Sequence, residues 1–207
     1  MRAWLSVAVV VLTTSSAAAK PGAIFIPPAE VDLGASSPVG DVLVGASTEV
    51  RVGVHWASLY WKPTPLDIGI GYVGSYRDVT PLTAERSSDE DANTLALHGL
   101  YFNMAYAIEN HRYWRTWLGG RVEGLSGSHA GRSYSVIGSA VRLAAELYST
   151  GAKGAADARV IGFFAGAFAL GVYVEGTKRF GLPAELGSVG VGAGVTMRVP
   201  FIAAIGD

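Results

Sequence analysis

The sequence predicts an all-β fold, a single antiparallel transmembrane β-barrel of eight strands. In long segments such as "VGVGAGVTMRV" (189–199), apolar residues alternate with small or polar ones at a period of two. The apolar stripe of these segments carries no Asp, Glu, Lys or Arg, and His98 is the nearest exception. The opposite stripe combines glycine and alanine with sparse charges of both signs. A soluble sheet would cover its outer face with polar residues, so we expect the apolar stripe to face lipid.

The first residues are expected to be a signal peptide covering 1–19. Arg2 gives it a positive start, Trp4 to Leu12 an apolar run too short to span a bilayer, and Ala17-Ala18-Ala19 a small-residue cleavage site. A membrane-anchored amphipathic helix is the alternative. Residues 20–40 are expected to be a periplasmic N-terminal lead-in, and residues 41–207 the β-barrel domain.

Seven alternating segments follow in the chain, and the first is long enough to supply two strands. A three-residue turn near 46–48 would divide it without changing which positions are apolar, which gives eight strands in total. The segment 135–147 also fits a helical stripe, but its neighbours on both sides alternate with a period of two, so we predict a strand. The seven segments are 41–61, 66–76, 94–108, 114–125, 135–147, 159–177 and 189–199.

The connections between segments predict the topology. Outer-membrane barrels have short periplasmic turns and longer outer loops. The short connections 62–65 and 109–112 are therefore expected to face the periplasm, and the longer ones, 77–93 and 126–133, to face outward. Both chain ends then lie in the periplasm.

Ten ionised residues lie on the stripe opposite the apolar one, and we predict that they point into the lumen. Five acids and five bases can neutralise one another across a narrow barrel and plug it. They are Glu49, Arg51, Asp67, Arg115, Arg121, Glu123, Arg142, Glu146, Glu175 and Arg198.

Aromatic residues gather at the ends of the predicted strands, as in the interfacial girdles of membrane barrels. Strand-end aromatics of a soluble β-domain are the alternative interpretation. The predicted interfacial set is Trp56, Tyr60, Tyr76, Tyr106, Trp114 and Tyr134.

Composition excludes several classes of function. The chain has 207 residues and no cysteine, so it has no disulfide, thiolate nucleophile or cysteine zinc site. Its formal net charge is −1, which does not favour a nucleic-acid partner. "GIGYVG" at 69–74 spells a dinucleotide motif but lies within a strand with no following helix. We therefore expect no cofactor.

Other polar groups point only weakly to chemistry. Asp89, Asp91 and Asn93 open a calcium-loop pattern that the following residues do not complete, which leaves a loose divalent site or a solvated loop. A loop holds Ser126, Ser128 and His129 near Glu123, but sequence alone gives them no catalytic geometry. We predict no catalytic and no metal site. His55, on the inward stripe, is expected to join the lumen network.

The mature chain resembles the small eight-stranded outer-membrane barrels of Gram-negative bacteria, with the architecture of OmpA, OmpX and OmpW. The resemblance rests on the signal peptide, the strand alternation and a closing strand with Gly194, Met197, Val199 and Phe201. It carries no family-specific functional motif.

The resemblance implies an outer-membrane location, with outer-membrane lipid, the barrel-assembly machinery and envelope proteins as partners. It also implies a non-enzymatic structural or interaction role. The alternatives are a conduit for small hydrophobic molecules, a barrel-type lipid-modifying hydrolase and a soluble periplasmic β-barrel.

Overall fold

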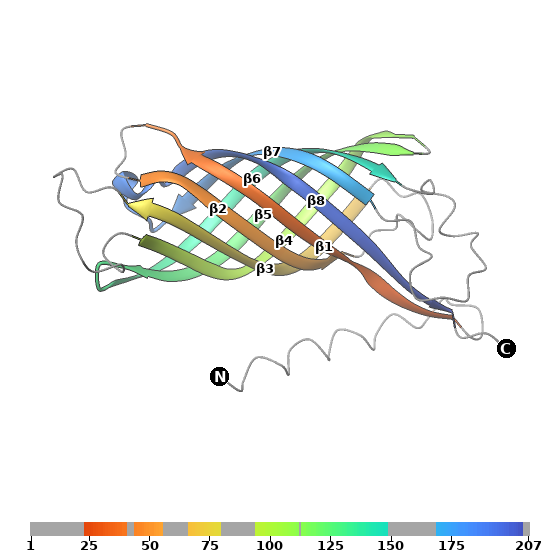
Figure 1. The fold of residues 1–207 in the computed structure, drawn as a ribbon, viewed down its shortest axis with the longest axis horizontal. Helices are drawn as coiled ribbons and strands as arrows, with labels where there is room; N and C mark the ends of the chain where they lie inside the picture. The colour runs from red at the N-terminus through yellow and green to blue at the C-terminus, as the bar shows by residue number, and fades with distance from the viewer. Residues whose placement is uncertain are drawn as a thin grey trace.

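The computed structural model describes residues 23–40, 44–55, 66–79, 94–111, 113–148 and 169–204. They form one closed antiparallel barrel in which each strand pairs with its neighbours in the sequence and the first pairs with the last, which confirms the predicted fold class. The strands run obliquely to the long axis (Figure 1). They are β1 (Ala23–Pro38), β2 (Val44–His55), β3 (Leu66–Val79), β4 (Thr94–Asn110), β5 (Trp114–His129), β6 (Arg132–Tyr148), β7 (Ala169–Phe180) and β8 (Val189–Ala204), with a short 3-10 helix η3 (Ala184–Leu186) between the last two.

The N-terminal boundary of the barrel differs from the expected one. Most of the expected lead-in, 20–40, is strand β1, which pairs with both β2 and β8. β1 contains Pro27 and Pro28, and proline cannot donate to a strand ladder. The structure accommodates the pair at a register shift between Ile26 and Ala29. The expected signal peptide, 1–19, lies outside the described residues.

The turn predicted near 46–48 was wrong. β2 continues through these residues as a single strand, with only a register shift between Val44 and Ser47. The side-chain oxygens of Ser36 and Ser47 lie 2.6 Å apart across the β1–β2 pair. The second strand that this turn was meant to create is supplied by β1 instead.

The loop predicted at 126–133 was also wrong, because β5 and β6 extend through most of it. They are joined by a two-residue turn in which Ala130 and Gly131 have φ angles of 48° and 73°. Positive φ at both positions is the geometry of a tight hairpin turn. The strand predicted at 135–147 is confirmed as part of β6.

The remaining connections agree only in part with those expected. Residues 77–79 belong to β3 and residues 80–93 lie outside the described residues, as do 62–65. β4 ends at Asn110 and β5 begins at Trp114, so the short connection at 109–112 is present. The last predicted segment before β8, 159–177, becomes β7 from Ala169 onward, and 159–168 lie outside the described residues.

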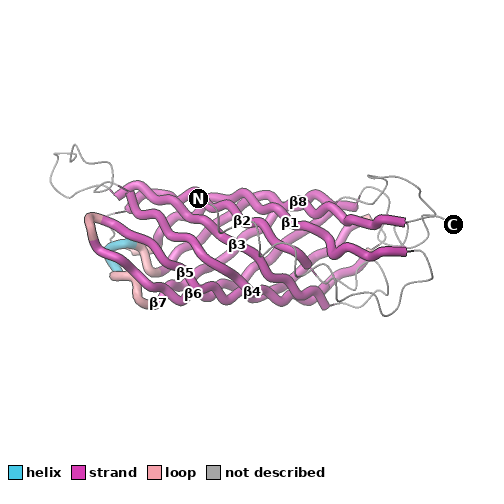
Figure 2. The backbone as a smooth tube through the Cα atoms, turned by 90° about the horizontal axis from the view of Figure 1, so that it is seen from below, coloured by secondary structure: helices cyan, strands magenta, loops and turns pink. Residues whose placement is uncertain are grey.

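The barrel has two distinct ends. At the terminal end, β1 begins, β8 ends and β4 turns into β5; at the loop end lie the β5–β6 turn and the β7–β8 loop with η3 (Figure 2). No helix within the described residues is long and apolar enough to cross a membrane.

Inward-facing glycines make room for large side chains that cross the lumen. A Cβ atom at Gly53 would overlap the hydroxyl of Tyr101, and one at Gly34 or Gly194 would overlap the hydroxyl of Tyr173. These three glycines of the inward stripe therefore leave the space that the two tyrosines need. Side chains from other strands therefore fill the space next to strands that carry few side chains on their inner face.

Candidate functional site

The structure places all ten predicted lumen charges inside the barrel. Nine are buried, and the side chain of Arg142 is 13% exposed. Most of them alternate along their strands with exposed apolar residues, as Arg121 and Glu123 do on either side of Val122. The alternation of the strands therefore places these ten charges on the inner face.

The centre of the lumen holds a closed ring of three arginines and three glutamates, which we call the charge ring. Arg51 contacts Glu49 at 2.7 Å and also contacts Glu175. Arg121 reaches Glu175 at 3.0 Å and Glu123 at 3.2 Å. Arg179 closes the ring, with Glu49 at 2.6 Å and Glu123 at 3.2 Å. Each glutamate contacts two arginines. Because the ring contains three of each, its net charge is zero.

Three strands contribute one acid and one arginine each to the charge ring. Glu49 and Arg51 stand two residues apart on β2, and Arg121 and Glu123 stand two residues apart on β5. β7 adds a further pair, with Glu175 four residues before Arg179. Even spacing in a strand keeps both side chains on one face. The contacts of Arg51 with Glu175 and of Glu49 with Arg179 join β2 to β7 across the lumen, and β7 is joined in turn to β5.

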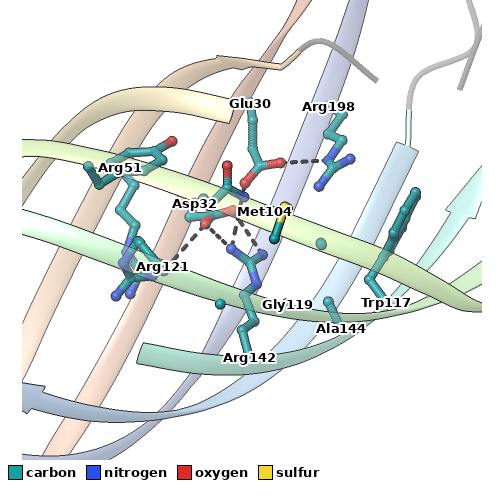
Figure 3. A pocket seen from close by; sticks show the side chains of 14 residues that line it. Glu30, Asp32, Arg51, Met104, Trp117, Gly119, Arg121, Arg142, Ala144 and Arg198 are labelled. Atoms are coloured by element: carbon teal, nitrogen blue, oxygen red, sulfur yellow. Dashed lines mark hydrogen bonds and ion pairs between the residues drawn. The ribbon is translucent and has the colours of Figure 1, made fainter. Parts of the chain in front are cut away.

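Asp32 links the charge ring to a second group of charges toward the terminal end. Its carboxylate accepts from Arg51 at 3.3 Å and is held by both terminal nitrogens of Arg142, at 2.5 and 3.3 Å. Arg142 also lies 4.0 Å above the ring of Tyr173, a cation–π distance. Figure 3 shows Asp32 among the arginines that converge on it.

Arg198 organises the charges of the terminal end. It lies 2.5 Å from Glu30, 2.8 Å from Asp67 and 3.2 Å from Glu146. The indole N–H of Trp117 donates to Glu146 at 2.9 Å. These contacts join β1, β3, β5, β6 and β8 inside the barrel.

His55 lies within this terminal group and has no exposed surface. Its Nδ1 is 2.9 Å from Asp67, and its Nε2 is 3.1 Å from Glu30. Only an imidazolium carries a proton on both nitrogens, so the doubly protonated ring suits two carboxylates. As expected, His55 belongs to the lumen network.

The sequence analysis missed four charged residues of the lumen. Glu30 and Asp32 fell in the presumed lead-in, Arg77 in a presumed loop, and Arg179 beyond the end of a predicted strand. All four are buried. The alternation of Glu30 and Asp32 with apolar neighbours could have revealed the first two.

The predicted interfacial aromatics divide into three groups. Tyr76 and Tyr106 are exposed, and Trp114 is half-buried. Tyr134 packs inside the barrel against a hydrophobic cluster, so its assignment to the interface was wrong. On β6, Tyr134 lies between the exposed residues Ser133 and Ser135, so its side chain is on the inner face. Trp56 and Tyr60 lie outside the described residues.

A small cavity lies beside the charges. Its volume is about 30 Å³ of space for water centres, and Asp32, Arg142 and Trp117 are among the residues that line it (Figure 3). Tyr101 and Asn103 also line it, and each has a buried oxygen with no hydrogen-bond partner. A water needs about 10–15 Å³ measured in this way, so the cavity has room for at least one water.

The polar groups that might have formed a catalytic site are not brought together. Ser126 and Ser128 are exposed on the outer face of β5, whereas Glu123 points into the lumen. His129 lies near the carbonyl of Thr94, at 3.3 Å. Among the described residues, no group of three or more acidic or histidine side chains could hold a metal ion. Asp89, Asp91 and Asn93 lie outside the described residues.

Comparisons with known proteins find no matching family model and no matching curated protein. Among solved structures, the barrel is similar to the N-terminal β-barrel domain of Pseudomonas aeruginosa OprF, with 11% sequence identity and a TM-score of 0.34. The match covers 84% of this chain and 98% of the OprF domain. The architecture given above rests on the strand pairing of this chain.

Proposed function

We propose that the chain is an outer-membrane β-barrel protein of a Gram-negative envelope, with a structural or interaction role and a lumen closed by ion pairs. Lipid would surround the barrel, and the barrel-assembly machinery would insert it. The terminal end would face the periplasm and the loop end the outside. The proposal rests on one observation: the barrel has apolar side chains on its outer face and charged side chains inside, the reverse of a water-soluble protein.

The outer face supports a lipid environment. Large apolar side chains are exposed on all eight strands, for example Val122 at 56% and Val172 at 60%. A water-soluble protein rarely exposes a continuous apolar surface of this extent. We call this surface the apolar belt: Leu33, Val50, Val52, Ile70, Tyr72, Leu100, Phe102, Met104, Leu118, Val122, Val141, Leu143, Val172, Val174, Val191, Val195 and Met197.

The inner face supports a closed lumen. Seven carboxylates and seven arginines occupy it among the described residues, so the set balances in charge. An ion moving through would have to separate pairs that are held at contact distance, and separating a buried pair is costly. The carboxylates are Glu30, Asp32, Glu49, Asp67, Glu123, Glu146 and Glu175, and the arginines are Arg51, Arg77, Arg115, Arg121, Arg142, Arg179 and Arg198.

Conductance across planar lipid bilayers tests the closed lumen. We expect the inserted wild-type chain to show no steady ion conductance. Replacing two members of the charge ring, Arg51→Ala with Arg121→Ala, removes both arginines that hold Glu175 and opens space beside it. Combined with Leu186→Ser, which replaces a buried leucine of η3 at the loop end of the barrel, this variant is expected to conduct where the wild type does not.

Lys178→Ala is the matched control, because Lys178 is an exposed cation on the outer face of β7. It should leave the bilayer as silent as the wild type does. Steady conductance of the inserted wild type would overturn the closed lumen and favour a channel.

A further inference from the structure

The interior of the barrel changes character toward the loop end. There the lumen holds a hydrophobic cluster next to the buried Arg77, and the wall residues of the cluster come from β3, β4, β5 and β6. Leu95 and Val73 have no exposed surface. We call this group the apolar core: Val73, Val79, Leu95, Leu97, Tyr101, Leu125, Val136, Leu182 and Leu186.

Two members of the apolar core come from the β7–β8 loop and close the mouth of the barrel from inside. Leu182 lies two residues before η3 and Leu186 is the last residue of η3, and they are 6% and 4% exposed. The loop holds its shape through hydrogen bonds from the Leu186 amide to the Pro183 carbonyl and from the Gly187 amide to the Ala184 carbonyl, at 3.0 and 2.9 Å.

Arg77 fastens this loop to the barrel wall. Its Nη1 donates to the carbonyl oxygen of Gly187 at 2.7 Å and to that of Leu186 at 3.3 Å. Gly187 has a φ of 75°, a conformation that glycine adopts without strain. A buried arginine thus binds the backbone of the loop while two leucines fill the space beside it.

On β5 and β6 the outer face changes in the opposite sense at the same end, whereas β8 begins there with the exposed valines Val189 and Val191. Along β5 the outward residues pass from Leu118 and Val122 to Ser126 and Ser128. Along β6 they pass from Leu147, Leu143 and Val141 to Ser135 and Ser133. We call the outward-facing part at this end the collar: Thr48, Asp78, Ser126, Ser128, Ser133 and Ser135.

The boundary between belt and collar carries residues suited to the headgroup region. Ile137 and Phe180 pair across β6 and β7 and are the last large apolar residues there. The amine of Lys178 lies 5.1 Å above the ring of Phe180. Aromatic side chains and a lysine with its charge directed to water are typical of a membrane interface.

We infer that the loop end of the barrel stands in water beyond the bilayer, as a polar collar around an apolar core that the β7–β8 loop closes. A water-soluble barrel has apolar side chains inside and polar side chains outside. The loop end has this arrangement, and it starts where the apolar belt ends. The inference rests on the proposed membrane location. It adds a second closure of the lumen, separate from the charge ring.

Single cysteines on one face of β6 test the position of the collar, because the chain has no cysteine of its own. Ser135→Cys lies in the collar and Leu143→Cys in the belt. Each is labelled with an environment-sensitive dye in the full chain, reconstituted in vesicles. We expect aqueous iodide to quench the label at 135 and brominated lipid to quench the label at 143.

The two labels separate failure of this inference from failure of the proposed function. If lipid quenches both labels, the barrel is in the membrane but the collar is not in water, and the inference is wrong. If iodide alone quenches both, the belt is not in lipid, and the proposed function fails as well.

Limited proteolysis tests the closure by the loop. Glu185 is exposed, next to buried Leu186, so a glutamyl endopeptidase can report whether the loop opens. We expect the loop of the wild type to resist cleavage, and Leu186→Ser to raise the rate of cleavage at Glu185 at least tenfold. Ala184→Ser, at an exposed neighbour, should leave the rate unchanged.

Equal cleavage of the wild type and Leu186→Ser would show that the apolar core does not hold the loop. If Leu186→Ser does not fold, Arg77→Gln provides a second variant, since it removes the hydrogen bonds to the loop carbonyls and keeps the apolar core. It is expected to raise cleavage at Glu185 in the same direction, and an unchanged rate would overturn the closure.

Discussion

Arg51→Ala is expected to lower the free energy of unfolding of the barrel by about 3–5 kcal/mol, the cost of removing one partner from a buried ion pair. Arg51 contacts three carboxylates, those of Asp32, Glu49 and Glu175. Its loss opens the charge ring, and Arg142 is then the arginine that still contacts Asp32. Urea unfolding of the protein in lipid vesicles, followed by tryptophan fluorescence, measures the change.

The control for Arg51→Ala removes the same charge from the outer face. Lys178→Ala is expected to change the free energy of unfolding by less than about 1 kcal/mol, since an exposed charge contributes little. If the two variants unfold at the same urea concentration as the wild type, the charge ring does not stabilise the barrel and this part of the account is wrong.

Val122→Arg is expected to block assembly of the barrel into membranes. Val122 is 56% exposed in the apolar belt, so the substitution places a charge in lipid at a cost of about 2–4 kcal/mol near the midplane. The fraction of chain that becomes folded with vesicles, read from the gel mobility of unheated samples, should fall well below that of the wild type.

Ser126→Arg is the matched control for Val122→Arg. It lies four residues further along β5 on the same outer face, but in the collar. A charge there should be tolerated, because it meets water. Equal folding of the two variants would contradict the division of the outer face into belt and collar.

The fold could be predicted from the sequence because alternation decides which face each residue occupies. β4, β5, β6 and β8 were all recognised from it, although their ends shifted. The first strand was missed because residues 20–40 were assigned to a lead-in and the eighth strand was sought within 41–61, while the closure of the barrel is a global requirement. A closed sheet needs a partner for β8, and β1 supplies it despite the prolines.

The inward direction of the charges was predictable, but their partners were not. Alternation placed Glu49 and Glu175 in the lumen without showing that Arg51 contacts both. Contacts across the lumen depend on the stagger and tilt of the strands, which no single segment encodes. The apolar core was missed for a related reason, since it combines wall residues with a loop that the alternation does not describe.

Flotation of the refolded full chain with lipid vesicles in a density gradient tests the central claim, that the apolar belt lies in lipid, most directly. The account predicts that the chain floats with the vesicles and stays with them after a wash at alkaline pH in sodium carbonate, which removes peripheral proteins. A chain that folds without lipid or detergent and remains at the bottom of the gradient would contradict it, and would identify a soluble barrel.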